Sequence, residues 1–153
     1  IPARRAPTSI GCIIEDGVID EQYYLTESTM PRWRYVKGAK QELRHRKDGT
    51  RYIFSEGAVP FPDPLNRPGR TMLTSEGSLN RSSHVILDPT SNRLRTLTPI
   101  ECERLNGFPD NWTAGMPDRM RYFTMGNALV VPIISDIGKH ILQFTLRYIK
   151  NGR

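Results

Sequence analysis

Cysteine and histidine are scarce in this sequence of 153 residues. The chain has two cysteines, Cys12 and Cys102, and three scattered histidines, His45, His84 and His140. Two distant cysteines give no disulfide framework and no metal-ligand spacing, so the sequence predicts neither a disulfide-stabilised domain nor a metal site. This cysteine usage is typical of a reducing compartment, and we therefore expect a cytoplasmic protein.

Long apolar runs are also missing. No run approaches the roughly 20 residues that a membrane helix needs. The N-terminal "IPARRAPTS" lacks the apolar core of a signal peptide. We therefore expect no membrane partner. The hydrophobic fraction of 37% is low, which fits a small soluble fold or a fragment that depends on a partner.

Basic residues outnumber acidic ones by 22 to 16, and the excess is concentrated in one place. The segment from Met30 to Arg51 holds eight basic and two acidic residues, while the rest of the chain holds fourteen of each. Trp33, Tyr35 and Tyr52 lie within or beside this segment. A basic cluster with interleaved aromatic residues favours nucleic acid as the partner. A solvated surface of ordinary lysines and arginines is the alternative.

Turn and cap residues divide the first part of the chain into short elements. Ser9 and Gly17 fit the two ends of a short helix. Pro31 fits the first turn of a second helix that stops at Gly38. The pair Asp48-Gly49 predicts a β-hairpin with a type I′ turn, because basic residues and the strand-like "RYIF" flank it.

The middle of the chain is rich in proline and polar residues. "AVPFPDPLNRPG" predicts an extended surface loop, since four prolines within nine residues exclude a helix or a central strand. "RTMLTSEG" and "HVILD" predict short strands, separated by the polar loop "SLNRSS" and followed by the turn "PTSN". Short strands joined by long basic loops make a poor self-contained core and suit loops that reach into a partner.

The last third of the chain is predicted to be helical. Thr98 and Glu101 fit a capping box, with Pro99 at the first helical position and Gly107 at the helix end. Glu101 is therefore interpreted as a helix cap and not as a catalytic group. A final helix is expected from near Asn127 toward Tyr148, because apolar residues recur there in steps of three and four.

Two C-terminal segments together carry a family resemblance. "RTLTPIECERLNGFPDNW", Arg95 to Trp112, and "MGNALVVPIISDI", Met125 to Ile137, resemble the last two conserved blocks of the bacterial DNA (cytosine-5) methyltransferases. "PGRTMLTSEG" is similar to the final strand of that family's target-recognition region, and "VIDEQYYLTES" to the segment that leads into it. The resemblance runs from about residue 10 to the end, and it covers only the C-terminal portion of a complete family member.

Several blocks of that family are missing from these 153 residues. They are the Phe-x-Gly-x-Gly cofactor block, the Pro-Cys nucleophile, the Glu-Asn-Val block and the Gln-x-Arg-x-Arg block. Cys12 follows Gly11 and Cys102 follows Glu101, so neither is the nucleophile. Methyl transfer to cytosine C5 needs a thiolate at C6 and a carboxyl group beside N3. The sequence therefore predicts no catalytic residue here and a catalytic half in a separate subunit or in another part of a longer chain.

The resemblance also implies where ligands bind. Asn127 and Ala128 would close the S-adenosylmethionine pocket at the start of the last helix, although Asn127 as a simple N-cap is equally compatible. Thr71 would contact a DNA phosphate, or be an ordinary strand residue. Arginines and polar residues on loops would read bases or hold phosphates in the major groove. The remaining DNA-binding candidates are Arg44, Arg46, Arg51, Arg70, Ser75, Asn80 and Arg81.

We therefore expect an α/β fold with three parts. Residues 1–19 form an arm and connecting helix, residues 20–92 a small, irregular, β-rich target-recognition domain, and residues 93–153 a helical segment. That segment would complete a Rossmann-like methyltransferase domain supplied by the catalytic half. The expected partners are double-stranded DNA and this half, in a bacterial restriction-modification system in the cytoplasm, near the nucleoid. The alternative is a stand-alone, non-catalytic DNA-binding or regulatory protein derived from such an enzyme.

Overall fold

Two small antiparallel sheets and four α-helices make up residues 8–151, the part of the chain that this computed structural model describes. The elements in chain order are the 3₁₀ turns η1 (Ile10–Cys12) and η2 (Glu21–Tyr23), α1 (Met30–Lys37), β1 (Lys40–His45), β2 (Arg51–Glu56), β3 (Val85–Leu87), β4 (Leu94–Thr96), α2 (Pro99–Asn106), α3 (Asp118–Asn127) and α4 (Val131–Asn151). This mixed content with small sheets confirms the coarse α/β class.

The strands β1 and β2 form the hairpin that the Asp48-Gly49 pair predicts. The type I′ turn is wrong, however, because Gly49 is in the left-handed region (φ 83°) and Asp48 is not. The Gly49 amide donates to the Arg46 carbonyl, and the Arg46 amide donates to the Thr50 carbonyl. This is the pattern of a three-residue loop with a glycine bulge, the next most common way to close a hairpin.

The second sheet pairs β3 with β4, and its first strand confirms the prediction for "HVILD". The strand expected in "RTMLTSEG" is absent, because the free edge of β3 is already occupied. Asp63 donates its amide to the Val85 carbonyl and accepts the Val85 amide at its side chain. The proline-rich loop is thus tied to the sheet and is not purely a surface loop, since Asp63 is buried.

The expected helix from Ser9 to Gly17 is only the short turn η1. Its bonds are those of a 3₁₀ turn, since the Cys12 amide donates to the Ser9 carbonyl and the Ile13 amide to the Ile10 carbonyl. The free first-turn amides of Ile10 and Gly11 donate to the carbonyls of Arg67 and Leu65, which ties the turn to the proline-rich loop.

The capping box of α2 is confirmed. The Thr98 side chain accepts the Glu101 amide, the Glu101 side chain accepts the Thr98 amide, and Gly107 ends the helix in the left-handed conformation. The final helix begins later than expected: Asn127 is the last residue of α3, and α4 starts at Val131. Pro132 explains the break, since its ring within a continuous helix would clash with the carbonyl of Ala128.

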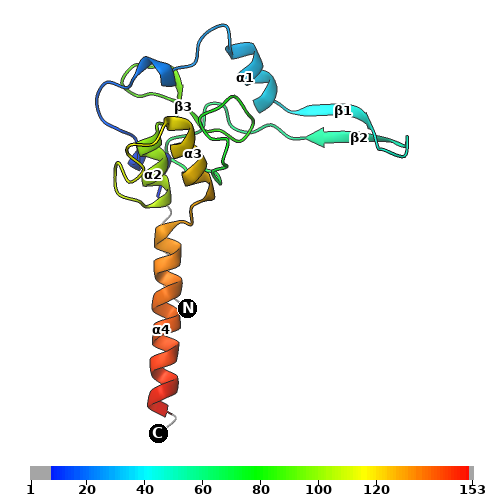
Figure 1. Cartoon of the computed structure of the whole chain (residues 1–153). Helices are drawn as coiled ribbons and strands as arrows, with labels where there is room; N and C mark the ends of the chain where they lie inside the picture. Colours follow the sequence, from blue (N-terminus) through cyan, green and yellow to red (C-terminus); the bar gives the residue numbers. More distant parts are fainter. Residues whose placement is uncertain (1–7, 152–153) are drawn as a thin grey trace.

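The core joins distant segments and contains much charge. Its apolar cluster is Ile10, Ile13, Met72, Ile86, Leu97, Cys102, Tyr122 and Met125. Buried among the surrounding residues are several charged groups, including Lys37, Glu76, Arg95, Glu101 and Glu103. Figure 1 shows that the β1–β2 hairpin and α4 both leave this body, in different directions.

Candidate nucleic-acid interface

The projecting hairpin carries three of the arginines predicted to bind DNA. Arg44 is held by its neighbours: its guanidinium donates to Glu42 at 3.2 and 2.9 Å and lies 3.6 Å from the centre of the Phe54 ring. Tyr35 of α1 donates to the same carboxylate at 3.0 Å. The hydrogen bonds from Arg44 and Tyr35 keep the pKa of the Glu42 carboxyl below its ordinary value. The carboxylate therefore stays charged and fixes Arg44.

Arg46 and Arg51 lie at the hairpin tip and are exposed. The guanidinium of Arg46 lies 5.6 Å from the centre of the Tyr52 ring. Within residues 8–151, no ion pair or side-chain hydrogen bond engages Arg51. These two side chains are therefore available to an external anion.

Arg81 and Lys37 lock the root of the hairpin to the body. Arg81 donates to the carbonyls of Val36, Gly38 and Gly57, and it pairs with Glu56 at 2.9 Å. In return, Lys37 at the end of α1 donates to the carbonyls of Arg81, at 3.0 Å, and Ser83. Burial, with the nearby charge of Arg70, lowers the pKa of Lys37 to about 8. This root clasp, Lys37 with Arg81, fixes the direction in which the hairpin points.

Arg70 is also engaged within the protein. It forms a two-pronged pair with Asp63, at 2.9 and 3.0 Å, and donates to the carbonyls of Ser82 and Ser83. Its own amide donates to the buried His84 imidazole at 2.9 Å. Arg70 therefore holds the shape of the loop that runs between β2 and β3, beneath the hairpin.

Asn80 and Ser75 belong to the same loop. The Asn80 side chain donates to the Ser75 carbonyl at 2.7 Å and accepts the amides of Ser82 and Ser83. The Thr71 side chain is exposed, and within the described residues it has no hydrogen bond. The predicted DNA-binding residues thus divide into three groups. Arg46, Arg51 and Thr71 are exposed and make no ion pair within residues 8–151, Arg44 is held within the hairpin, and Arg70, Ser75, Asn80 and Arg81 take part in the contacts that hold the loop and the hairpin root.

Asn127 and Ala128, the predicted cofactor-binding pair, lie in the junction between α3 and α4. Asn127 is not the N-cap of the last helix, since it ends α3 and its side-chain amide donates to the Phe123 carbonyl at 3.1 Å. The Ala128 amide donates to the Met125 carbonyl. Asn127, Leu129 and Val130 are exposed in this junction, so it is open to solvent.

The two cysteines have no catalytic setting. Cys102 is fully buried, and burial raises the pKa of its thiol well above the ordinary value. Cys12 is exposed, with Sγ 3.2 Å from the Ser9 hydroxyl. Between residues 8 and 151 no group of three or more histidine, cysteine or acidic side chains is arranged to hold a metal ion.

Helix α2 joins the parts of the body through its charged residues. Arg95 and Glu101 form a buried, two-pronged pair with both distances 2.7 Å, and Glu101 also accepts the Glu15 amide. Arg104 pairs with Asp110 and donates to the carbonyls of Ile13 and Ile14. These two arginines thus tie the helix to the sheet and to the N-terminal turn.

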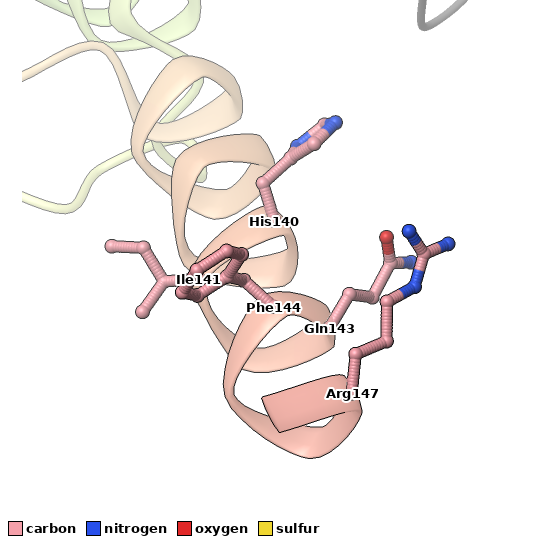
Figure 2. Close-up of a pocket in the computed structure, with 5 residues that line it drawn as sticks. All are labelled: His140, Ile141, Gln143, Phe144 and Arg147. Atoms are coloured by element: carbon pink, nitrogen blue, oxygen red, sulfur yellow. The ribbon is translucent and has the colours of Figure 1, made fainter. Parts of the chain in front are cut away.

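Helix α4 has an unpartnered apolar side. Its exposed apolar residues are Val131, Ile133, Ile134, Ile137, Ile141, Leu142, Phe144, Leu146, Tyr148 and Ile149. Figure 2 shows a shallow hollow lined by His140, Ile141, Gln143, Phe144 and Arg147, all from this one helix. Within the described chain, only α4 lines the hollow, so it is open and not an enclosed pocket.

By length and composition, the stretch Asp118–Ile149 is apolar enough to cross a membrane. The evidence is weak, because the core helix of a soluble protein passes the same test. Polar residues also recur along one side of α4, at Asp136, Lys139, His140, Gln143 and Arg147. A one-sided polar stripe is typical of a helix that packs on a partner and faces water with its other side.

Sequence reasoning missed three groups of functional interest. It missed Lys37 as a clasp residue, α3 as a helix, and the apolar pair Leu43 and Ile53 on the hairpin. Neither "QELRH" nor "RYIF" alternates between apolar and polar residues, so the sequence carried no signal for this pair. Only the strand register, Leu43 opposite Ile53, places the two on one face.

Comparisons with known proteins agree on one family. The C-5 cytosine-specific DNA methylase family matches residues 7–143. The chain is 52% identical to type II methyltransferase M.Sau3AI of Staphylococcus aureus over 92% of this chain and 34% of that protein. It is 28% identical to M.HpaII of Haemophilus parainfluenzae over 86% of this chain and 37% of that protein. The chain thus spans about a third of the length of these relatives.

A solved structure shares the fold. The Dnmt2 methyltransferase of S. pombe superposes with a TM-score of 0.62 at 16% identity, over 93% of this chain and 44% of that one. Because the family match covers most of the 153 residues and includes both C-terminal blocks, the chain belongs to the C-5 cytosine-specific DNA methylases.

Proposed function

We propose that this chain is the DNA-recognition part of a DNA (cytosine-5) methyltransferase. The enzyme transfers a methyl group from S-adenosylmethionine to C5 of a cytosine flipped out of a specific duplex sequence. The catalytic cysteine comes from the catalytic half, the part of such an enzyme that carries the cofactor and Pro-Cys blocks. The enzyme acts in a bacterial restriction-modification system, in the cytoplasm at the nucleoid.

One observation carries the proposal: the same small body presents a cationic hairpin on one side and an unpartnered apolar helix on another (Figure 1). The hairpin suits DNA, because its tip arginines are exposed and its root is fixed by Lys37 and Arg81. The helix suits the catalytic half, because large exposed apolar patches mark interaction sites. A stand-alone DNA-binding protein has no use for the second surface.

The division of chemical work follows from the residues present. Arg46 and Arg51 supply cations for phosphates or guanine edges. Asn127 and Ala128 form one wall of the S-adenosylmethionine pocket, and the catalytic half supplies the rest. The bound cofactor supplies the methyl group. No residue of this chain serves as nucleophile or general acid, in keeping with the buried Cys102 and with Glu101 committed to Arg95.

Complementation tests this function. The chain is co-expressed with the catalytic half of a related type II methyltransferase, and transfer of labelled methyl groups to DNA is measured. We expect transfer only when both parts are present. An α4 variant, I137D/I141D, should abolish both co-purification and transfer, while the matched control K139D on the polar side should not. Methyl transfer by the chain alone, or no association with any such half, contradicts the proposal.

A further inference from the structure

The register of the hairpin gives it two faces of different chemistry. Cross-strand partners share a face, and successive residues alternate between faces. The stacked face carries Lys40, Glu42, Arg44, Tyr52, Phe54 and Glu56. The open face carries Gln41, Leu43, His45, Arg51, Ile53 and Ser55.

The stacked face is occupied by its own contacts. Arg44 is paired with Glu42 and stacked on Phe54. Lys40 pairs with Glu56 at 3.9 Å and lies 4.3 Å from the centre of the Tyr35 ring. A guanidinium held in this way would have to leave these partners before it could pair with a guanine. This face therefore stiffens the hairpin.

The open face has no such contacts. Leu43 and Ile53 lie directly opposite one another and are 60% and 63% exposed. His45 and Arg51 form the next pair toward the tip, and no ion pair or side-chain hydrogen bond within residues 8–151 engages either side chain. An exposed apolar pair beside an unpaired arginine suits an occupant that offers both methyl groups and negative charge.

The major groove of duplex DNA meets both needs. A two-stranded ribbon fits its width, thymine presents a C5-methyl group there, and phosphates border it. The hairpin also belongs to the segment that holds the whole basic excess of the chain. A protein partner would cover the apolar pair but would have no need of the arginine beyond it.

Building on the proposed function, we propose that the open face enters the major groove and that Leu43 and Ile53 contact thymine methyl groups. These two residues then determine sequence specificity by apolar contact, and Arg51 adds affinity through phosphate or guanine. The stacked face points away from the bases.

Replacing thymine with uracil tests this directly, because it removes only the methyl group. The 153-residue chain, alone and with the catalytic half, first selects its preferred duplex from a random-sequence pool made with thymidine. Affinity is then measured for that duplex and for its deoxyuridine counterpart. We expect about fourfold weaker binding for each contacted methyl group that is lost. L43A/I53A should bind both duplexes equally, and the matched stacked-face variant Y52S should keep the difference.

The outcomes separate the two proposals. If the wild-type chain selects no duplex, either alone or together with the catalytic half, the proposed function fails. If the selected duplex lacks thymine, or if the chain binds the thymine duplex and its deoxyuridine counterpart equally, only the open-face assignment is overturned. The same holds if L43A/I53A keeps the thymine preference but no longer associates with the catalytic half. Circular dichroism checks that the exposed substitutions leave the fold intact.

Discussion

Arg95 is completely buried, and its two terminal nitrogens donate to the two oxygens of Glu101. The same carboxylate accepts the amides of Thr98 and Glu15. Each Glu101 oxygen thus accepts two donors, which leaves no capacity for a substrate. Breaking a buried pair of this kind costs about 3–5 kcal/mol. Within the described chain, the guanidinium of Arg95 would stay buried with only Asp88, at 3.9 Å, as an ionic partner.

Glu101→Ala should therefore lower the free energy of unfolding by about 3–5 kcal/mol, as measured by urea denaturation. Asp110→Ala is the matched control, since it removes the partner of Arg104 at an exposed site. An exposed pair is worth about 0–1 kcal/mol, so the control should change little. Equal losses for the two variants would show that Arg95 and Glu101 do not form the pair described.

The sequence predicts part of this residue-scale picture. The capping role of Glu101 is local, because Thr98 and Glu101 are three residues apart, and it is confirmed. The partnership with Arg95 depends on how β4 is placed against α2, which no local pattern encodes. The same reason explains Arg70 and Arg81, whose acidic and carbonyl partners come from other segments.

Helices and strands with strong local signals are predicted well. α1, the β1–β2 hairpin and α2 follow from proline, glycine and capping residues, and β3 follows from the apolar run "HVILD". The errors arise where another segment takes the backbone bonds, as Asp63 does at β3. Gly126 gives a further example: a Cβ there would lie 2.4 Å from the backbone of Leu73 and Thr74. This close approach fixes the loop that holds Leu73 and Thr74 against α3, and no local sequence pattern predicts it.

Lys37 ties the end of α1 to the loop under the hairpin and gives this joint a pH dependence. Its pKa falls from the ordinary 10.5 to about 8 in the folded chain. Between these values the unfolded lysine binds a proton that the folded lysine does not. The lysine contribution to the free energy of unfolding therefore rises as pH increases from about 8 to 10.5.

Comparing wild type with Lys37→Gln isolates this contribution. We expect the difference in their free energies of unfolding, measured by urea denaturation, to grow in favour of wild type through that pH interval. Lys47→Gln, a change at the exposed hairpin tip, should leave the pH profile unchanged. Parallel curves for wild type and Lys37→Gln would mean that Lys37 keeps its ordinary pKa.

At the scale of the whole molecule, a small body carries two surfaces that it does not cover itself. Buried charged residues lie around its apolar core, and α4, the longest helix, contributes no residue to the apolar cluster. The family and both C-terminal blocks were predicted from the sequence and are confirmed. The domain boundaries at residues 19 and 92 remain predictions, as do the DNA-binding and cofactor-binding residues. We note that β3 and β4 pair across the second boundary.

The central claim is that this chain chooses the DNA sequence while another part performs the chemistry. Pairing the chain with the catalytic halves of two relatives of different specificity tests it most directly, with methylated cytosines mapped by bisulfite sequencing. The account predicts one and the same methylated sequence in both combinations, because the hairpin and loops are unchanged. A methylated sequence that changes with the catalytic half would contradict it.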